Sequence, residues 1–168
     1  RTFVRSAAQL PKVHEFIRQK LAEGRQAYIV FPRVEEGDVQ AGIKAVTQEF
    51  ERLQELFSPH RIGLLHGRLR AEEKDRVMTA FRANQLQVLL ATSVIEVGVD
   101  VPNATVMVIE NADQFGLVQL HQLRGRIGRG AHESYCILVA EAKTREASQR
   151  LNVLAGSNDG FEIAEADM

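Results

Sequence analysis

A short segment with two arginines offers the clearest chemistry in this sequence. Gln122, Arg126 and Arg129 follow one another at i, i+4 and i+7, so on a helix they would share one face. The apolar residues of the segment fall on the opposite side: Leu117, Leu120, Leu123 and Ile127. Glycines at 125 and 128 each cost about 1 kcal/mol relative to alanine inside a helix, which favours a close approach of a ligand to the backbone. We predict a helix whose arginine face receives a phosphate chain, the alternative being an ordinary solvated surface.

A second segment with chemical potential follows the apolar run at residues 88–91. Thr92 and Ser93 bring hydroxyl and backbone N–H donors to the end of a predicted strand, and such donors contact phosphate without a formal charge. For Thr92 the alternative is strand-end capping, and Asp100, before a Val-Pro pair, is either a ligand contact or a turn aspartate. Glu96 is either surface or a partner for the arginines.

The elements that must position these residues alternate along the chain. Helical spacing of apolar residues predicts helices at 9–23, 39–57, 71–84 and 144–154, besides the arginine helix. Short apolar runs predict strands at 27–31, 62–65, 88–91, 104–109 and 134–139. This alternation predicts an α/β fold with a mainly parallel sheet covered on both faces. Ligands of such sheets bind beyond the carboxyl ends of the strands, where the sequence places polar residues 32–33, 66–68, 92–93 and 110–113.

Composition narrows the class of protein. The chain has 168 residues, 45% hydrophobic and 26% charged, with a net charge of −1, so any nucleic-acid contact must come from a local patch. The one cysteine, Cys136, excludes an internal disulfide and a zinc spacing, and its apolar surroundings predict a buried thiol. No apolar run approaches the ~18 residues of a membrane span, so we expect a cytoplasmic protein. Neither a Walker-type phosphate loop nor an Asp-Glu pair for magnesium is present, so the sequence predicts half of an active site.

With these residues in view, the chain resembles a known family along essentially its whole length. Ala91-Thr92 followed by Asp100, and Gln122-x-x-Gly-Arg-x-Gly-Arg129, resemble motifs V and VI of superfamily 2 helicases, in the second of their two RecA-like motor domains. Residues 113–126 are similar to the branch of these helicases that holds the RecG type and the transcription-repair coupling factor. Within that branch, residues 94–104 and 158–165 are similar to the RecG type. The resemblance implies a RecA-like three-layer sandwich at 1–143. It also implies that 144–168 form a C-terminal helix and loop leading toward a truncated translocation segment.

The resemblance also implies roles for individual residues. Arg126 and Arg129 would reach the γ-phosphate of ATP, with Gly98, Asp100 and Gln122 near the nucleotide. The residues implied to follow the DNA backbone are Pro32, Arg33, His66, Gly67, Arg68, Thr92 and Ser93, although His66 could equally be an unremarkable loop histidine. No metal ligand is expected here, because the magnesium that accompanies ATP would be held by the first motor domain.

The function that the resemblance implies is ATP-dependent remodelling of forks and four-way junctions in DNA repair and recombination. The expected partners are branched DNA and, within the full-length chain, a first RecA-like domain and a wedge domain, with no membrane. One rival is the equivalent domain of a transcription-repair coupling translocase, against which residues 103–106 and 158–165 argue. Another is a non-enzymatic RecA-like interaction module, which would have no need of the arginine pair.

Overall fold

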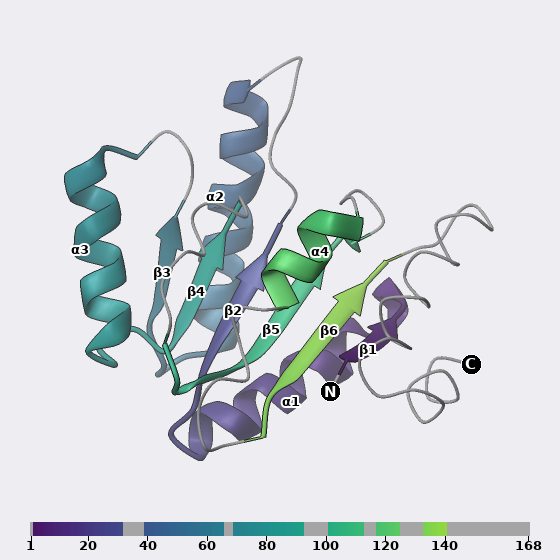
Figure 1. Ribbon diagram of the computed structural model, residues 1–168. Helices are drawn as coiled ribbons and strands as arrows, with labels where there is room; N and C mark the ends of the chain where they lie inside the picture. Colours follow the sequence, from purple (N-terminus) through teal and green to yellow (C-terminus); the bar gives the residue numbers. More distant parts are fainter. Residues whose placement is uncertain are drawn as a thin grey trace.

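The chain folds around one six-stranded sheet in the computed structural model, which describes residues 2–31, 39–65, 69–92, 101–112, 117–124 and 133–140. The strands lie in the order β1-β6-β5-β2-β4-β3, and every pairing is parallel (Figure 1). Their bounds are β1 Thr2–Arg5, β2 Gln26–Val30, β3 Ile62–Leu65, β4 Val88–Ala91, β5 Ala104–Glu110 and β6 Tyr135–Val139. The predicted parallel sheet is confirmed, and the predicted strand bounds agree within one residue.

The edge strand β1 was not predicted. It offers only Phe3 and Val4 as apolar residues, too short a run to indicate a strand. It forms because β6 provides a parallel partner far along the chain, with Thr2 opposite Cys136 and Arg5 opposite Val139.

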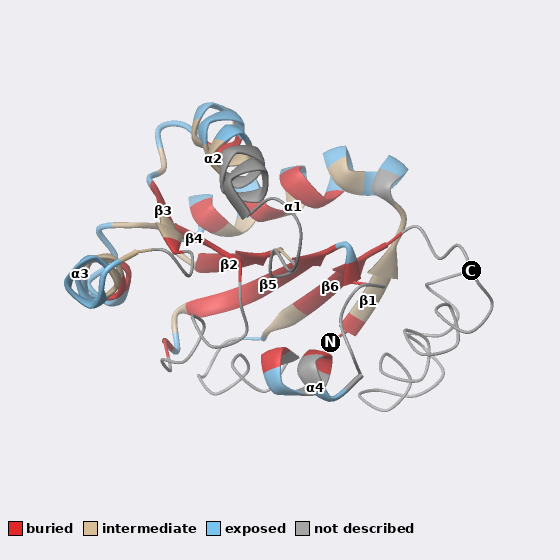
Figure 2. Ribbon diagram, turned by 90° about the horizontal axis from the view of Figure 1, so that it is seen from above, coloured by how far each residue is buried: buried red, intermediate tan, exposed pale blue. Residues whose placement is uncertain are grey.

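Helices cover both faces of the sheet. They are α1 Leu10–Ala22, α2 Val39–Leu56, α3 Ala71–Arg82 and α4 Leu117–Arg124, with a short 3-10 turn η1 at Ala7–Gln9. Helices α1 and α2 lie on one face, and α3 and α4 on the other (Figure 2). Pro11 occupies the first turn of α1, and Gly24, with φ of 89°, follows its end, both as the sequence predicts. The predicted helix at 144–154 lies outside the described residues.

The core has two layers because successive strand residues point to opposite faces. In β2, Ala27 and Ile29 pack toward α1 and α2, whereas Tyr28 and Val30 pack toward α3 and α4. All five residues of β2 are buried, as expected for a central strand of a sheet covered twice. Cys136 is buried, which confirms that prediction.

A buried amide joins the elements at the amino edge of the sheet. The Nε2 of Gln26 donates to the carbonyls of Phe81 and Leu86 at 2.6 and 2.8 Å, and its Oε1 accepts from Nδ2 of Asn103 at 3.0 Å. Asn103 also donates to the carbonyl of Gly24 at 2.9 Å. These bonds tie the end of α3 to the starts of β2 and β5.

Candidate functional site

Three strands end side by side at the carboxyl edge where the sequence places its polar loops. The backbone N–H of Phe31, after β2, donates to the carbonyl of Ala91 in β4 at 2.8 Å. The N–H of Thr92, after β4, donates to the carbonyl of Leu65 in β3 at 3.2 Å. Thr92 therefore lies between the ends of the two strands that precede the predicted DNA loops.

Thr92 is itself largely enclosed. It is 5% exposed, so only a small part of the residue is open to a ligand. Its backbone is held by the end of β3, which fixes where the following segment starts. Its predicted contact with a DNA phosphate stays a prediction.

Most of the other predicted site residues lie outside the described part of the chain. These are Pro32, Arg33, His66, Gly67, Arg68, Ser93, Gly98, Asp100, Arg126 and Arg129. The structure describes the ends of the strands β2, β3 and β4, which precede three of these segments, and the helix α4, which precedes Arg126 and Arg129, but not the segments themselves. Their roles stay predictions.

Helix α4 confirms the first half of the predicted arginine helix. Leu120 and Leu123 are buried against the sheet, while Gln122 is exposed, as the spacing predicts. One turn before Gln122, Val118 is 69% exposed and is the one large hydrophobic side chain exposed among the residues described. Val118 was not predicted to be a surface residue of this helix, although its place four residues before Gln122 puts both on one helix face.

Glu110 lies at this edge of the sheet, as predicted, but its side chain is buried. It ends β5 and is 8% exposed, and its Oε2 has no hydrogen-bond partner in the described structure. Burial, and to a smaller extent nearby Glu49, raise the pKa of Glu110 to about 7, against the opposing effect of Arg52. A charged residue ending a continuous apolar run was the sequence signal for this group.

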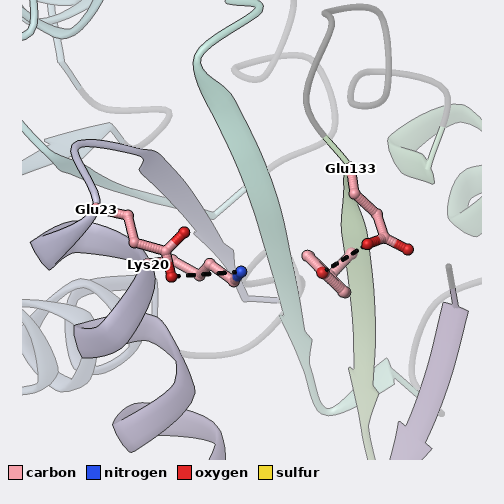
Figure 3. A network of polar contacts seen from close by, with 4 residues as sticks. Lys20, Glu23 and Glu133 are labelled. Carbon is pink, nitrogen blue, oxygen red and sulfur yellow. Dashed lines mark hydrogen bonds and ion pairs between the residues drawn. The ribbon is translucent and has the colours of Figure 1, made fainter.

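The amino edge of the sheet carries a different polar group (Figure 3). The Nζ of Lys20 lies 3.6 Å from a carboxylate oxygen of Glu23, and the hydroxyl of Tyr135 donates to Glu133 at 3.0 Å. A surface pocket of about 280 Å³ lies here, also lined by Arg25 and Thr105. The charges of its two cations and two carboxylates cancel. None of the predicted site residues lines it.

Two further classes of site find no support in the described ranges. No group of three or more metal-ligating side chains is brought together there. None of the helices in these ranges combines the length and the apolar character that crossing a membrane requires.

The fold defines the chain as a RecA-like α/β domain. Its sheet is parallel, helices cover both faces, and three strand ends meet where such domains bind ligands. The chain belongs to the helicase conserved C-terminal domain family, whose model matches residues 8–131.

Similar proteins agree with this assignment. The ATP-dependent DNA helicase RecG of Synechocystis is 55% identical over 99% of this chain and 20% of that protein, and RecG of Bacillus subtilis is 47% identical over 95% and 23%. A structure of RecG bound to a three-way DNA junction is 47% identical, with a TM-score of 0.79, over 98% of this chain and 21% of that one. The C-terminal domain of the DEAD-box protein Dbp5, at 19% identity and a TM-score of 0.60, covers 94% of this chain and 83% of that one and shows the shared fold. The chain thus spans about a fifth of the length of the RecG relatives it matches.

These likenesses confirm the predicted RecA-like fold and the resemblance to the RecG type. The predicted division at residue 143 falls in a part of the chain that the structure does not describe, and it stays a prediction.

Proposed function

We propose that this chain is the second motor domain of an ATP-dependent DNA helicase that remodels branched DNA in repair and recombination. The observation that carries the proposal is the likeness, across 98% of the chain, to RecG bound to a three-way DNA junction. Work on DNA would also make the protein cytoplasmic.

The face of α4 that carries Gln122 is open to a partner domain. Val118 and Gln122 are one turn apart and both exposed, so the helix offers an apolar side chain next to an amide on one surface. A single exposed valine is common on protein surfaces, so the proposal of a second domain rests on the divided active site and not on Val118. We propose that the first motor domain of the full-length protein covers this face and holds ATP and magnesium.

The chemistry of the proposed site is divided between the two domains. Arg126 and Arg129 follow α4 in sequence and would stabilise the charge that develops on the γ-phosphate during transfer to water. Gly98, Asp100 and Gln122 would line the nucleotide. Guanidinium groups suit this role because they stay charged and pair with phosphate oxygens through two parallel hydrogen bonds.

The DNA would lie across the ends of β2, β3 and β4. The segments that follow these strands contain Pro32, Arg33, residues 66–68, Thr92 and Ser93, and the hydrogen bonds of Phe31 and Thr92 bring their starting points together. Donors from several loops at one edge suit a phosphate backbone, which carries no sequence information.

An arginine substitution in the full-length protein tests the proposal. If Arg129 acts on the transition state, Arg129→Ala should lower DNA-stimulated ATP turnover by roughly 10³- to 10⁵-fold while changing ATP affinity much less. Arg129→Lys should not restore the rate, because an ammonium group cannot reproduce the planar fork.

The matched control is Arg68→Ala, which removes a cation from a predicted DNA loop. It should weaken DNA binding and leave the rate at saturating DNA nearly unchanged. Near-normal stimulated turnover in Arg129→Ala would refute the assignment of this segment to ATP. Loss of turnover at saturating DNA in Arg68→Ala would refute the assignment of its loop to DNA.

A further inference from the structure

A group of charged side chains lies between α2 and the sheet, and none of its members has been given a role in binding ATP or DNA. The guanidinium of Arg52 pairs with the carboxylate of Glu49, one turn earlier on α2. Glu110 of β5 is close enough to both for each to act on its titration. The alternation of β5 places Glu110 on the same side of the sheet, because Val106 and Val108, at alternate positions before it, pack toward α1 and α2.

Helix α1 adds two more groups to the same region. His14 is 6% exposed, its Nε2 has no hydrogen-bond partner in the described structure, and its ring meets Phe57 edge-on at 5.7 Å. Burial lowers the pKa of His14, and Arg52 and Arg18 lower it further against the effect of Glu49. His14 is therefore neutral near pH 7 and does not compensate the charge of Glu110.

In this structure Arg52 pairs with the more exposed carboxylate, Glu49, and the buried Glu110 has no partner for its Oε2 among the described residues. The side chain of Glu49 is 26% exposed, so water can solvate it, whereas Glu110 is buried and its Oε2 is unpartnered. A buried carboxylate without a partner is the more costly of the two. Arg52 has a long side chain that is 55% exposed, so it can turn without displacing core residues.

The two partners available to Arg52 belong to different parts of the fold. Glu49 lies on α2 itself, so that pair holds nothing else in place. Glu110 is the last residue of β5; Asn111 follows with φ of 52°, then buried Ala112, and α4 begins at Leu117. A bond from Arg52 to Glu110 would therefore join α2 to the segment that leads into α4.

We propose that Arg52 exchanges between Glu49 and Glu110, and that Glu110 is a positioning residue that couples α2 to the segment entering α4. Helix α2 follows the predicted DNA loop at 32–38, and α4 precedes the proposed ATP-facing arginines. Through this exchange, binding of DNA by the loop before α2 would affect the position of the arginines after α4. This inference rests on the proposed function.

The test uses the full-length protein with Glu110→Gln, Arg52→Gln and the double variant. ATP turnover is measured without DNA and at saturating junction DNA, together with the DNA concentration that gives half-maximal stimulation. We expect each single variant to lower the stimulated rate by about 3- to 10-fold, with the basal rate and the half-maximal DNA concentration unchanged. The double variant should be no slower than either single one, because both remove the same bond.

Two further measurements separate positioning from a purely structural role. The stimulated rate of the unmodified protein should fall as pH drops through about 7, where Glu110 takes up a proton. The rate of Glu110→Gln should not show this fall. Glu51→Gln, an exposed carboxylate on the same helix, is the matched control and should leave all rates unchanged. Arg52 is exposed, so Arg52→Gln carries the test even if Glu110→Gln fails to fold.

Three results would overturn the inference. The first is an equal loss of the basal and the DNA-stimulated ATP turnover. The second is a double variant whose loss is the product of the two single losses, and the third is normal stimulation in both single variants. An unmodified protein that DNA does not stimulate would remove the proposed function and this inference together. Normal stimulation that the variants leave intact would remove this inference alone.

Discussion

Replacing Glu110 by glutamine should stabilise the domain at alkaline pH and have little effect in acid. The side chain keeps its shape but can no longer ionise. Burial and Glu49 raise the pKa of Glu110 from 4.5 to about 7, and Arg52 opposes this shift. Folding therefore disfavours the charged form, and the stability of the natural domain falls as pH rises from about 4.5 through about 7.

The size of the effect follows from the shift. A shift of about 2.5 units at about 1.36 kcal/mol per unit makes the folded state roughly 3 kcal/mol less stable above pH 7 than it would be with a neutral group. At pH 5 the penalty is only about 1 kcal/mol, because the group is largely protonated in the folded state and partly so in the unfolded state. The gain from Glu110→Gln should therefore be about 2 kcal/mol larger at pH 8 than at pH 5.

Urea unfolding of the 168-residue chain at the two pH values measures this difference, and linear extrapolation gives the free energy of unfolding at each. Glu51→Gln, the exposed carboxylate on α2, controls for the loss of one negative charge and should show no such difference. If Glu110→Gln changed stability equally at pH 5 and pH 8, Glu110 would titrate normally and the account of its burial would be wrong.

Other substitutions test the packing and the division of the active site. Gln26→Leu should lower the free energy of unfolding by about 2–4 kcal/mol, measured in urea, because the carbonyls of Phe81 and Leu86 lose their buried donor; an unchanged stability would contradict the role given to this amide. Gly63→Ala should cost about 1–3 kcal/mol and lower Tm, since its Cβ would lie 2.5 Å from Cδ1 of Leu86 and 3.0 Å from Cγ1 of Val77; a normal Tm would mean that these side chains move aside freely. The isolated chain should hydrolyse no ATP and bind DNA weakly and with strong salt dependence; turnover that Arg129→Ala abolishes, or tight binding at physiological salt, would refute the half-site proposal.

The buried strands could be predicted from sequence because each is a continuous apolar run. Strand β3 agrees with its prediction at both ends, since Ile62 starts the run and the polar residues after Leu65 stop it. Strand β1 could not be predicted, because two apolar residues are compatible with many structures and only pairing with β6 selects one. Local pattern therefore identifies the centre of this sheet, and long-range pairing completes its edge.

The candidate site shows a similar limit. Spacing alone predicted that Leu120 and Leu123 pack and that Gln122 is exposed, because helix geometry fixes those directions. The direction of Glu110 could not be obtained this way, because a residue at the end of a strand can face either layer or solvent. Its neighbours on α2 lie far along the chain, so only the packed structure brings Glu49 and Arg52 to it.

The pairing of β1 with β6 also bears on how the domain folds. Adjacent strands such as β3 and β4 are joined by one helix, so their pairing closes a short loop and can form early. The β1–β6 pairing instead joins residues from nearly opposite ends of the described sheet, and β6 must already lie beside β5 before β1 has a partner. Loop-closure entropy therefore favours an order in which the central strands assemble first and β1 adds last. Until β1 pairs, β6 is an edge of the sheet, as β3 is at the other side, and its unpaired backbone groups are open to association with other chains.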